Sequence, residues 1–467
     1  MKTRFAPSPT GLIHPGNART ALFNALLAGQ QNGHFLLRIE DSDQERSKNE
    51  YIEALMSDLH WLGVQWQEGP DQQDKGSGPY LQSQRTEIYS QYFDQLITQN
   101  QAYPCFCSSE ELRTSRVAQR QAGLPPRYAG TCAHLNAEQV QRQYDAGRTP
   151  TLRFRVPATT TFSFDDLVKG PQRFASKDIG DFIIRKTDGM PAFFFCNAID
   201  DALMEVTQVL RGEDHLTNTP RQIALLQALN LTIPQYGHFS LITGQDNAPL
   251  SKRNGSHSLN TLKQQGYLPQ ALLNYMARLG HQYRDNNLMS VSQLSAQFSL
   301  EHISRSPAHY DAAQLNHWQQ EALQQADHNT LWHWLDNDTQ DLVPPNEQQD
   351  FIAAVRHNIL FPQDLITWTQ RVYGEPLLTD DAKQCLMDTP AEFFQVASEH
   401  CHDSAELKPI INALKNTLKV KGKALFMPLR AALTGTLSGP ELGPLLALIK
   451  TPEIKRRLNN AQTLAQP

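Results

Sequence analysis

The chain has 467 residues, of which 40% are hydrophobic and 19% charged, and its formal net charge is -6. This length exceeds what one hydrophobic core supports, and the net charge excludes a histone-like binder, so we expect a globular protein of several domains. No apolar run approaches the ~18 residues of a membrane span and no basic-then-apolar leader is present, which predicts a cytoplasmic protein without membrane contact.

The first sixty residues have the pattern of a nucleotide-binding βαβ unit. We expect a buried strand over 2–6, a Pro/Gly turn, and a helix over 16–30 with apolar residues at helical spacing. A second strand over 35–40 is apolar almost throughout, and a helix over 48–62 follows it. Strands of this kind belong in parallel sheets buried on both faces, so the fold class predicted is α/β with a Rossmann-like parallel sheet.

The middle of the chain interrupts this pattern. Cysteines and β-rich pieces at 151–156 and 182–185 precede two apolar strand patterns at 193–196 and 206–210, so the Rossmann-like domain is expected to be split by an insertion. Beyond about residue 262 helical periodicity dominates, which predicts an all-α C-terminal region. The predicted segments are a first Rossmann-like half (1–102), an insertion (103–188), a second Rossmann-like half (189–240), a loop and helical region (241–322) and a helical domain (323–467).

Two segments far apart carry the residue types of a polyphosphate site. His14 lies in a Gly/Pro turn between a predicted strand and a predicted helix, where the helix dipole and N-terminal amides favour an anion. The second segment, 249–253, places the cations Lys252 and Arg253 beside Ser251. A Gly/Pro turn alone is usually structural, and the two segments together indicate phosphate binding.

Six cysteines in a chain of this length are too few for a disulfide scaffold, so reduced thiols are expected. Cys105, Cys107, Cys132 and His134 form a set of four borderline-soft donors, which is the composition of a structural zinc site. A buried cluster of free thiols is the alternative, because the C-x-C pair differs from the common C-x2-C knuckle. Four protein ligands would leave no position for an activated water, so the metal would organise the fold.

Several stretches resemble bacterial glutamyl-tRNA synthetase, namely 4–11, 18–24, 37–41 and 209–214. The segments 7–17 and 249–253 are similar to the HIGH and KMSKS signatures of class I aminoacyl-tRNA synthetases. The resemblance implies ATP-dependent attachment of L-glutamate to tRNA-Glu through glutamyl-adenylate, with Mg²⁺ accompanying ATP, by a cytoplasmic monomer. It also implies a zinc-bearing insertion that binds the acceptor end, a KMSKS-like loop and helical stem-contact region, and a helical anticodon-binding domain.

The resemblance assigns roles to individual residues of this chain. His14, Lys252 and Arg253 would stabilise the transition state of adenylate formation, mainly by electrostatics. Arg4 and Arg211 would bind the two carboxylates of glutamate through paired charge-assisted hydrogen bonds, although a surface salt bridge would explain either alone. The ATP-binding set is Ser8, Thr10, Gly16, Ser251 and Lys252; the amino-acid pocket is Arg4, Ala6, Ser8, Glu40, Phe193, Asn197 and Arg211.

The chain departs from the family pattern at four positions. Pro15 occupies a position where the family usually has Ile or Val, and Asn17 occupies the last position of the HIGH-like tetrapeptide. Pro249 replaces the first lysine of KMSKS, and Phe193 replaces a pocket tyrosine. These departures motivate the alternative of a non-catalytic tRNA-binding paralogue. A shortened paralogue that modifies a tRNA base lacks the helical domain, and a glutaminyl enzyme usually has a β-barrel in its place.

The helical region also bears on the choice of tRNA. Enzymes of this family that reject tRNA-Gln use an arginine in a loop that corresponds to 358–365, and this stretch contains none. Relaxed charging of tRNA-Gln is therefore predicted, with Arg356 or Arg371 as residues that could serve instead. Basic segments at 113–127 and 415–423 are candidates for RNA contact, or else are solvated helix faces.

Overall fold

The computed structural model describes residues 1–43, 45–244, 246–248, 250, 257–401 and 406–465. The chain divides into two compact units, one of residues 1–262 with 272–312 and one of 263–271 with 313–467. None of the described helices is long and apolar enough to cross a membrane. The domain boundaries expected from the sequence stay predictions.

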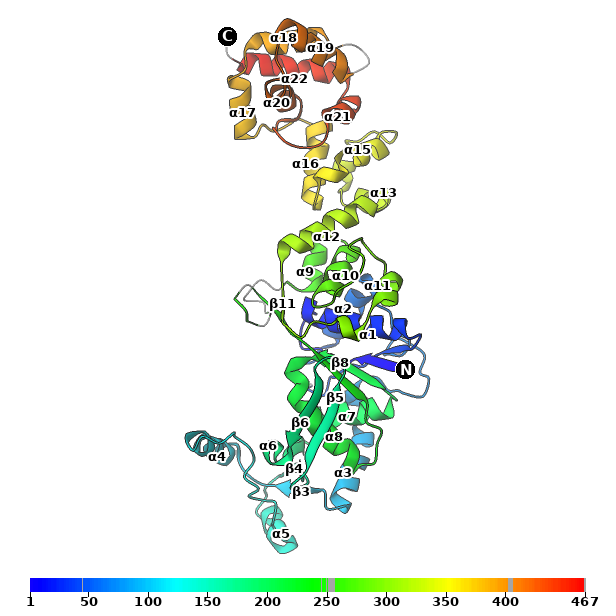
Figure 1. Cartoon of the computed structure of the whole chain (residues 1–467), viewed down its shortest axis with the longest axis vertical. Coiled ribbons are helices and arrows are strands. Elements are labelled where there is room, and N and C mark those ends of the chain that lie inside the picture. The colour runs from blue at the N-terminus through cyan, green and yellow to red at the C-terminus, as the bar shows by residue number, and fades with distance from the viewer. Residues whose placement is uncertain (44, 245, 249, 251–256, 402–405, 466–467) are drawn as a thin grey trace. The chain divides into compact units, whose positions relative to one another are not determined.

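The first unit is organised around a four-stranded parallel sheet in the order β2-β1-β8-β9. Strand β8 of this sheet is labelled in Figure 1. Its strands are β1 (Lys2–Phe5), β2 (His34–Leu37), β8 (Gln208–Gly212) and β9 (Gln235–Phe239). The prediction of a parallel sheet assembled from two distant parts of the chain is confirmed. Because the chain leaves β1 toward β2 on one side and returns as β8 on the other, a topological switch point lies between β1 and β8.

Helices cover both faces of this sheet. Phe23 of α1 (Pro15–Gln30) packs edge-to-face on Phe239 of β9, with ring centroids 5.4 Å apart. Residues of α7 (Phe193–Leu203) and α8 (Thr219–Ala228) share a core with Val209 of β8 and Tyr236 of β9. Because strand side chains alternate, these two residues lie on the face of the sheet opposite to Phe239. The sheet is therefore buried on both faces, which explains its continuous apolar strands.

The prediction of a strand at 193–196 is wrong, because these residues begin α7. A short apolar run cannot distinguish a strand from a buried helix, and the residues after it decide the matter. Phe195, Ala198 and Ile199 are buried at helical spacing. The strand expected at 206–210 is found as β8, shifted by two residues.

The segment between the two halves of the sheet forms small antiparallel sheets. One contains β3 (Ala102–Cys105), β4 (Thr151–Phe154) and β7 (Phe182–Arg185), and the other contains β5 (Thr161–Asp166) and β6 (Gly170–Ala175). The remaining elements of the first unit include a short pair, β10 (Ile242–Thr243) and β11 (Ala308–His309), with α2 (Asn49–Trp61), α3 (Thr86–Thr98), α4 (Ser109–Gln121), α5 (Ala137–Asp145), α6 (Ser176–Ile179) and α11 (Val291–Gln297).

The described secondary-structure elements of the second unit are all helices, as the sequence predicts. The apolar stripe expected around 407–418 corresponds to α19 (Leu407–Thr417), which buries Ile410 and Leu414. The other helices after residue 311 are α12 (Ala312–Gln325), α13 (His328–Trp332), α14 (Asn337–Gln340), α15 (Gln348–Val355), α16 (Pro362–Tyr373), α17 (Asp380–Met387), α18 (Ala391–Glu399), α20 (Lys423–Thr434), α21 (Leu442–Leu448) and α22 (Thr451–Leu464). α9 (Leu259–Gln264) and α10 (Pro269–Arg278) lie in the stretch where the chain passes between the units.

Candidate active site

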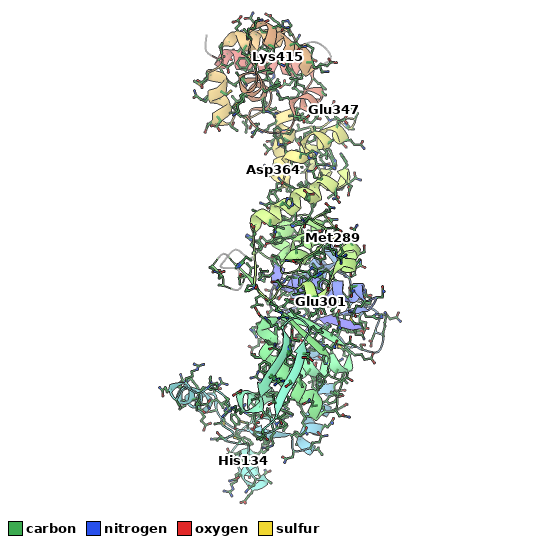
Figure 2. All side chains as sticks on the ribbon, in the orientation of Figure 1. His134, Met289, Glu301, Glu347, Asp364 and Lys415 are labelled. Atoms are coloured by element: carbon green, nitrogen blue, oxygen red, sulfur yellow. The ribbon has the colours of Figure 1, made fainter. Side chains whose placement is uncertain are left out.

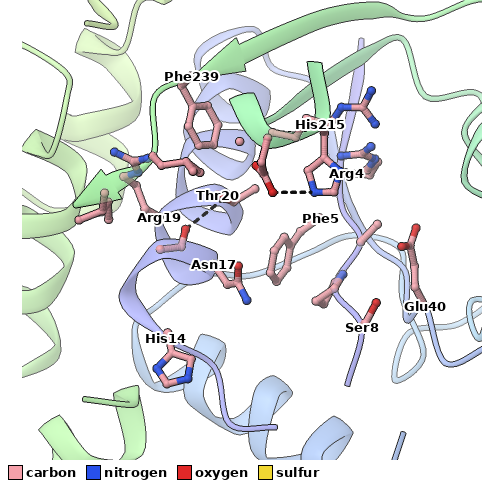
Figure 3. Close-up of a pocket in the computed structure, with 18 of the residues that line it drawn as sticks. Arg4, Phe5, Ser8, His14, Asn17, Arg19, Thr20, Glu40, His215 and Phe239 are labelled. Atoms are coloured by element: carbon pink, nitrogen blue, oxygen red, sulfur yellow. Dashed lines mark hydrogen bonds and ion pairs between the residues drawn. The ribbon is translucent and has the colours of Figure 1, made fainter. Parts of the chain in front are cut away.

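A cavity of about 450 Å³ lies at the carboxyl ends of β1 and β8, at the switch point of the sheet (Figure 3). It is the place where an open α/β sheet usually binds its ligand. Every described residue among those predicted for catalysis, ATP binding and amino-acid binding lines it: Arg4, Ala6, Ser8, Thr10, His14, Gly16, Glu40, Phe193, Asn197 and Arg211.

The segment predicted to supply mobile cations falls outside the described residues. Ser251, Lys252 and Arg253 belong to it, as does Pro249. Leu250 is described, and it lines the cavity while its amide donates to the carbonyl of Ile242 at 2.9 Å.

One side of the cavity is formed by the N-terminus of α1. His14 is the N-cap residue, Pro15 occupies the first turn, and that turn carries no acidic residue. The first amides of a helix have no intrahelical partner, so they and the helix dipole favour an anion here. A Cβ atom added to Gly16 would meet no atom of the described residues within 4 Å, so this part of the cavity leaves space for a ligand.

The opposite side of the cavity contains Arg4, Ser8 and Glu40, away from His14 and Asn17 (Figure 3). Arg4 donates from Nε and Nη2 to the two carboxylate oxygens of Asp201, at 3.2 and 3.3 Å. Asp201 also accepts from Arg38 at 2.7 Å, and Arg38 contacts Glu40 at 3.2 Å. Arg4 therefore belongs to a buried ionic cluster, and its interaction with Asp201 is not a surface salt bridge.

Arg211 presents a buried cation without a counter-ion. Its Nε donates to Nε2 of His238 at 3.0 Å, and its Nη2 donates to Thr219 at 2.8 Å and Gln222 at 2.7 Å. All three partners are neutral acceptors, and no described residue forms a hydrogen bond with Nη1, which is buried. Burial lowers the pKa of Arg211 to about 10, which still leaves it cationic at neutral pH. A carboxylate in the cavity would satisfy Nη1, because an unpaired buried charge is costly.

Glu40 follows β2 and supplies the negative charge of the cavity. Its Oε1 accepts from Asn197 at 2.5 Å and from Arg38 at 3.2 Å. Burial raises the pKa of Glu40, although Arg38 and Asn197 oppose this shift. The cavity thus combines a carboxylate and cationic guanidinium groups, which is the charge pattern that an amino acid requires.

Sequence reasoning missed some residues that line the cavity. His215 lies in the 3-10 helix after β8, and its ring is 5.5 Å from that of Phe193. Burial, and then Arg211, lower the pKa of His215 to about 4, so it is neutral at physiological pH. The available signal was its position four residues after Arg211, at the carboxyl end of a predicted strand. Thr20 was missed because it lies inside α1, one turn beyond the recognised motif.

A second candidate site involves the cysteines of the segment between the two sheet halves. The Sγ atoms of Cys105, Cys107 and Cys132 all lie within 4.8 Å of one another. The hydroxyl oxygen of Tyr128 is 3.3 Å from Sγ of Cys105 and 3.7 Å from Sγ of Cys107, and it accepts from the Cys132 amide at 2.8 Å. His134, labelled in Figure 2, is exposed and is not part of this group.

Comparisons with known proteins agree with this geometry. Residues 1–317 match the family described as class I tRNA synthetases (E and Q), catalytic domain, and residues 349–462 match an anticodon binding domain. The fold and the cavity thus define a class I aminoacyl-tRNA synthetase.

Similar proteins narrow the family. Glutamate–tRNA ligase 2 of Nitrosococcus oceani is 54% identical, with 98% of each chain covered, and that of Coxiella burnetii is 49% identical, with 99% of each covered. A crystal structure of a glutamate tRNA ligase from Elizabethkingia meningosepticum, in complex with its amino acid, superposes with a TM-score of 0.87 at 26% identity, covering 99% of both chains. The chain belongs to the glutamate–tRNA ligase family.

Proposed function

We propose that this aminoacyl-tRNA ligase activates L-glutamate with ATP as glutamyl-adenylate and transfers the glutamyl group to tRNA-Glu. The observation that carries the proposal is the buried guanidinium of Arg211, whose Nη1 has no hydrogen-bond partner within the described part of the cavity wall. The carboxylate of Glu40 in the same cavity suits the substrate ammonium. Glutamate supplies a carboxylate for Arg211 and an ammonium group for Glu40.

The proposed chemistry has two displacements. A glutamate carboxylate oxygen attacks the α-phosphorus of ATP and pyrophosphate leaves; a terminal ribose hydroxyl of tRNA then attacks the acyl carbon and AMP leaves. Arg211 and Glu40 orient the amino acid, while His14 and the first amides of α1 face the polyphosphate. Mg²⁺, accompanying ATP, would neutralise phosphate charge.

Exposed basic side chains offer a surface for tRNA near the acceptor end. The helix α4 buries none of its residues and exposes Arg113, Arg116 and Arg120. A second cavity of the first unit is lined by Arg116 and Arg120 together with Arg153, Lys186 and Arg221. Such a concentration of cations on a poorly packed element suits phosphate contacts, even though the whole chain is acidic. A monomer in the cytoplasm stays our prediction.

Charging of tRNA-Glu and tRNA-Gln transcripts side by side tests the function and the relaxed specificity together. We expect both to be charged with glutamate, because the stretch 358–365 lacks the arginine that would separate them by roughly 1–3 kcal/mol. Arg356 donates to the carbonyl of Gln324 at 3.1 Å, and Arg371 donates to the carbonyls of Leu377 and Thr434. Neither arginine is therefore a ready substitute.

The outcomes of this assay are distinct. If tRNA-Gln is charged more than about a thousandfold less efficiently than tRNA-Glu, roughly 4 kcal/mol, discrimination is intact and the relaxed specificity is refuted. If neither transcript accepts glutamate in the presence of ATP, the chain is the non-catalytic tRNA-binding paralogue.

Substitution of Gly16 separates ligand binding from folding. In Gly16→Ala we expect the melting temperature to stay level or rise, because alanine is favoured over glycine inside a helix by up to about 1 kcal/mol. The new methyl group would occupy the open space beside α1, so the KM for ATP should increase by roughly tenfold or more. Thermal unfolding and ATP-dependent charging measure the two effects. Gly29→Ala is unsuitable as a control, because its Cβ atom would clash with Ser295. Gly443→Ala, also in a helix with open space, is the matched control, and an ATP requirement that is equally unchanged in both variants would contradict the ATP site.

We propose that the three cysteines hold a structural zinc ion and that Tyr128, not His134, supplies the fourth ligand. Tetrahedral zinc with sulfur at about 2.3 Å and oxygen at about 2.0 Å spaces its ligand atoms roughly 3.5–3.8 Å apart. The separation of Cys107 and Cys132 Sγ is 3.7 Å, and the Tyr128 hydroxyl lies at similar distances from two of the thiols. The fourth ligand expected from the sequence was His134, whose exposed side chain lies apart from this group.

Metal analysis of variants tests this site without reference to activity. We expect about one zinc per chain in the native protein, loss of zinc in Cys105→Ser and Tyr128→Phe, and retention in His134→Ala. Replacement of zinc by Co²⁺ should give thiolate charge-transfer bands. We expect these bands to differ from those of the native protein in Tyr128→Phe and to be unchanged in His134→Ala. Zinc that is lost in His134→Ala and kept in Tyr128→Phe would restore the histidine as ligand, and the absence of zinc from native protein purified without chelator would refute the metal site.

A further inference from the structure

The guanidinium of Arg211 donates a hydrogen bond to His238, which has no other role in the proposed reaction. Arg211 in β8 and His238 in β9 are direct register partners, and both are buried. The Nδ1 atom of His238 lies 2.5 Å from Oδ2 of Asp166, and both of these side chains are fully buried. Oδ1 of Asp166 accepts the amides of Val168, Lys169 and His238 at 2.8–3.1 Å.

The chemistry of arginine fixes the tautomer of this histidine. A guanidinium can only donate, so Nε2 of His238 must be the unprotonated acceptor of the Arg211 Nε–H. Nδ1 therefore carries the hydrogen and donates it to Asp166. Burial lowers the pKa of His238, in agreement with a neutral ring. Asp166 thus selects the one form of His238 that can hold Arg211.

The hydrogen bonds continue from Arg211 across the cavity to the carboxylate of Glu40. Oε1 of Gln222 accepts from Arg211, so its Nε2 is the atom that donates to Oδ1 of Asn197 at 2.7 Å. Asn197 must then donate from Nδ2 to Glu40. Each amide orientation follows from the previous bond, and Gln222 and Asn197 are at most 2% exposed. A single hydrogen-bond chain links Asp166, His238, Arg211, Gln222, Asn197 and Glu40.

We propose that Asp166, His238 and Gln222 are positioning residues that fix the direction of the hydrogen bonds in this chain, which joins the two charged ends of the amino-acid pocket. This inference rests on the proposed binding of glutamate by Arg211 and Glu40. Asp166 belongs to β5, in the segment that separates the halves of the sheet. That segment therefore contributes to substrate affinity through a residue that never touches the substrate.

The substitution Asp166→Asn tests the tautomer directly. Oδ1 would keep its three amide donors, so the new NH₂ group would face Nδ1 of His238 and drive the hydrogen to Nε2. Nε2–H would then oppose Nε–H of Arg211. We expect the KM for glutamate to rise by tenfold or more, with kcat and the KM for ATP within about threefold of native values.

Further variants keep the test independent of folding. His238→Gln places an amide oxygen where Arg211 requires an acceptor, and it should retain more glutamate affinity than His238→Phe at equal melting temperature. Gln222→Glu places a carboxylate beside Arg211 and removes the donor to Asn197, so it should raise the KM for glutamate at least tenfold. Gln319→Glu, an equally buried glutamine of the other unit, is the matched control and should affect stability alone.

The outcomes separate the positioning role of Asp166, His238 and Gln222 from the proposed function. If native protein charges tRNA with glutamate while Asp166→Asn and Gln222→Glu leave the KM for glutamate unchanged, the positioning role is refuted. If His238→Phe and His238→Gln behave alike in KM, the acceptor at Nε2 has no role. Failure of the native protein to charge tRNA would refute the proposed function, on which the inference depends.

Discussion

Replacing Arg211 with alanine should raise the KM for glutamate by on the order of 100-fold to 1,000-fold. Truncating one partner of a buried, hydrogen-bonded charge pair costs about 3–4 kcal/mol, much of it from the partner left unpaired. The KM for ATP should change far less, because the polyphosphate side of the cavity is formed by α1. Initial rates of tRNA charging at varied glutamate and fixed saturating ATP provide the measurement.

Two controls define what this result means. Arg211→Lys keeps the charge but loses the planar fork, so it should recover only a small part of the affinity. Arg284→Ala removes an exposed arginine of the same unit and should leave the KM for glutamate unchanged. A native KM for glutamate in Arg211→Ala would remove this residue from the pocket and, with it, the basis for glutamate binding proposed above.

Replacing Lys252 with alanine should slow the formation of the adenylate by roughly 100-fold or more, about 3 kcal/mol of transition-state stabilisation. Pro249 stands where the family signature has its first lysine, so Lys252 is left to contact the triphosphate. Lys252 lies outside the described residues, and Leu250 just before it lines the cavity. Single-turnover charging measures the rate, and filter binding measures the affinity for tRNA.

The affinity for tRNA should be nearly unchanged in Lys252→Ala, since a single transition-state contact contributes little to ground-state binding. Lys177→Ala, at an exposed position in α6, is the control for a general loss of positive charge. An equal loss of rate and tRNA affinity in Lys252→Ala would point to misfolding or to a role in RNA binding.

The parts of the site that the sequence predicts are those carried by local patterns. Strand, turn and helix around His14, and an acidic residue at the end of the second strand, are continuous in the chain, so β1, α1 and Glu40 were predicted. The run at 193–196 was assigned wrongly because four apolar residues fit a strand and a buried helix equally well. The burial of Phe195, Ala198 and Ile199 at helical spacing in the structure distinguishes the two.

The parts that escaped prediction depend on contacts between distant segments. Asp166 and His238 are 72 residues apart, and nothing near either residue indicates the other. His134 fits the spacing of a metal ligand, whereas Tyr128 reaches the thiols of Cys105 and Cys107 only because the fold brings segments more than 20 residues apart together. Residue type and spacing therefore locate donors, but the tertiary fold selects which of them meet.

The strand order of the sheet has a consequence for synthesis of the chain on the ribosome. β1 lies between β2 and β8, and β8 begins more than 200 residues after β1 begins. At about 5–20 residues per second, β1 waits on the order of 10–40 s with one edge unpaired. An exposed strand edge can pair with other chains, so the nascent N-terminal segment is a natural client for chaperones until β8 emerges.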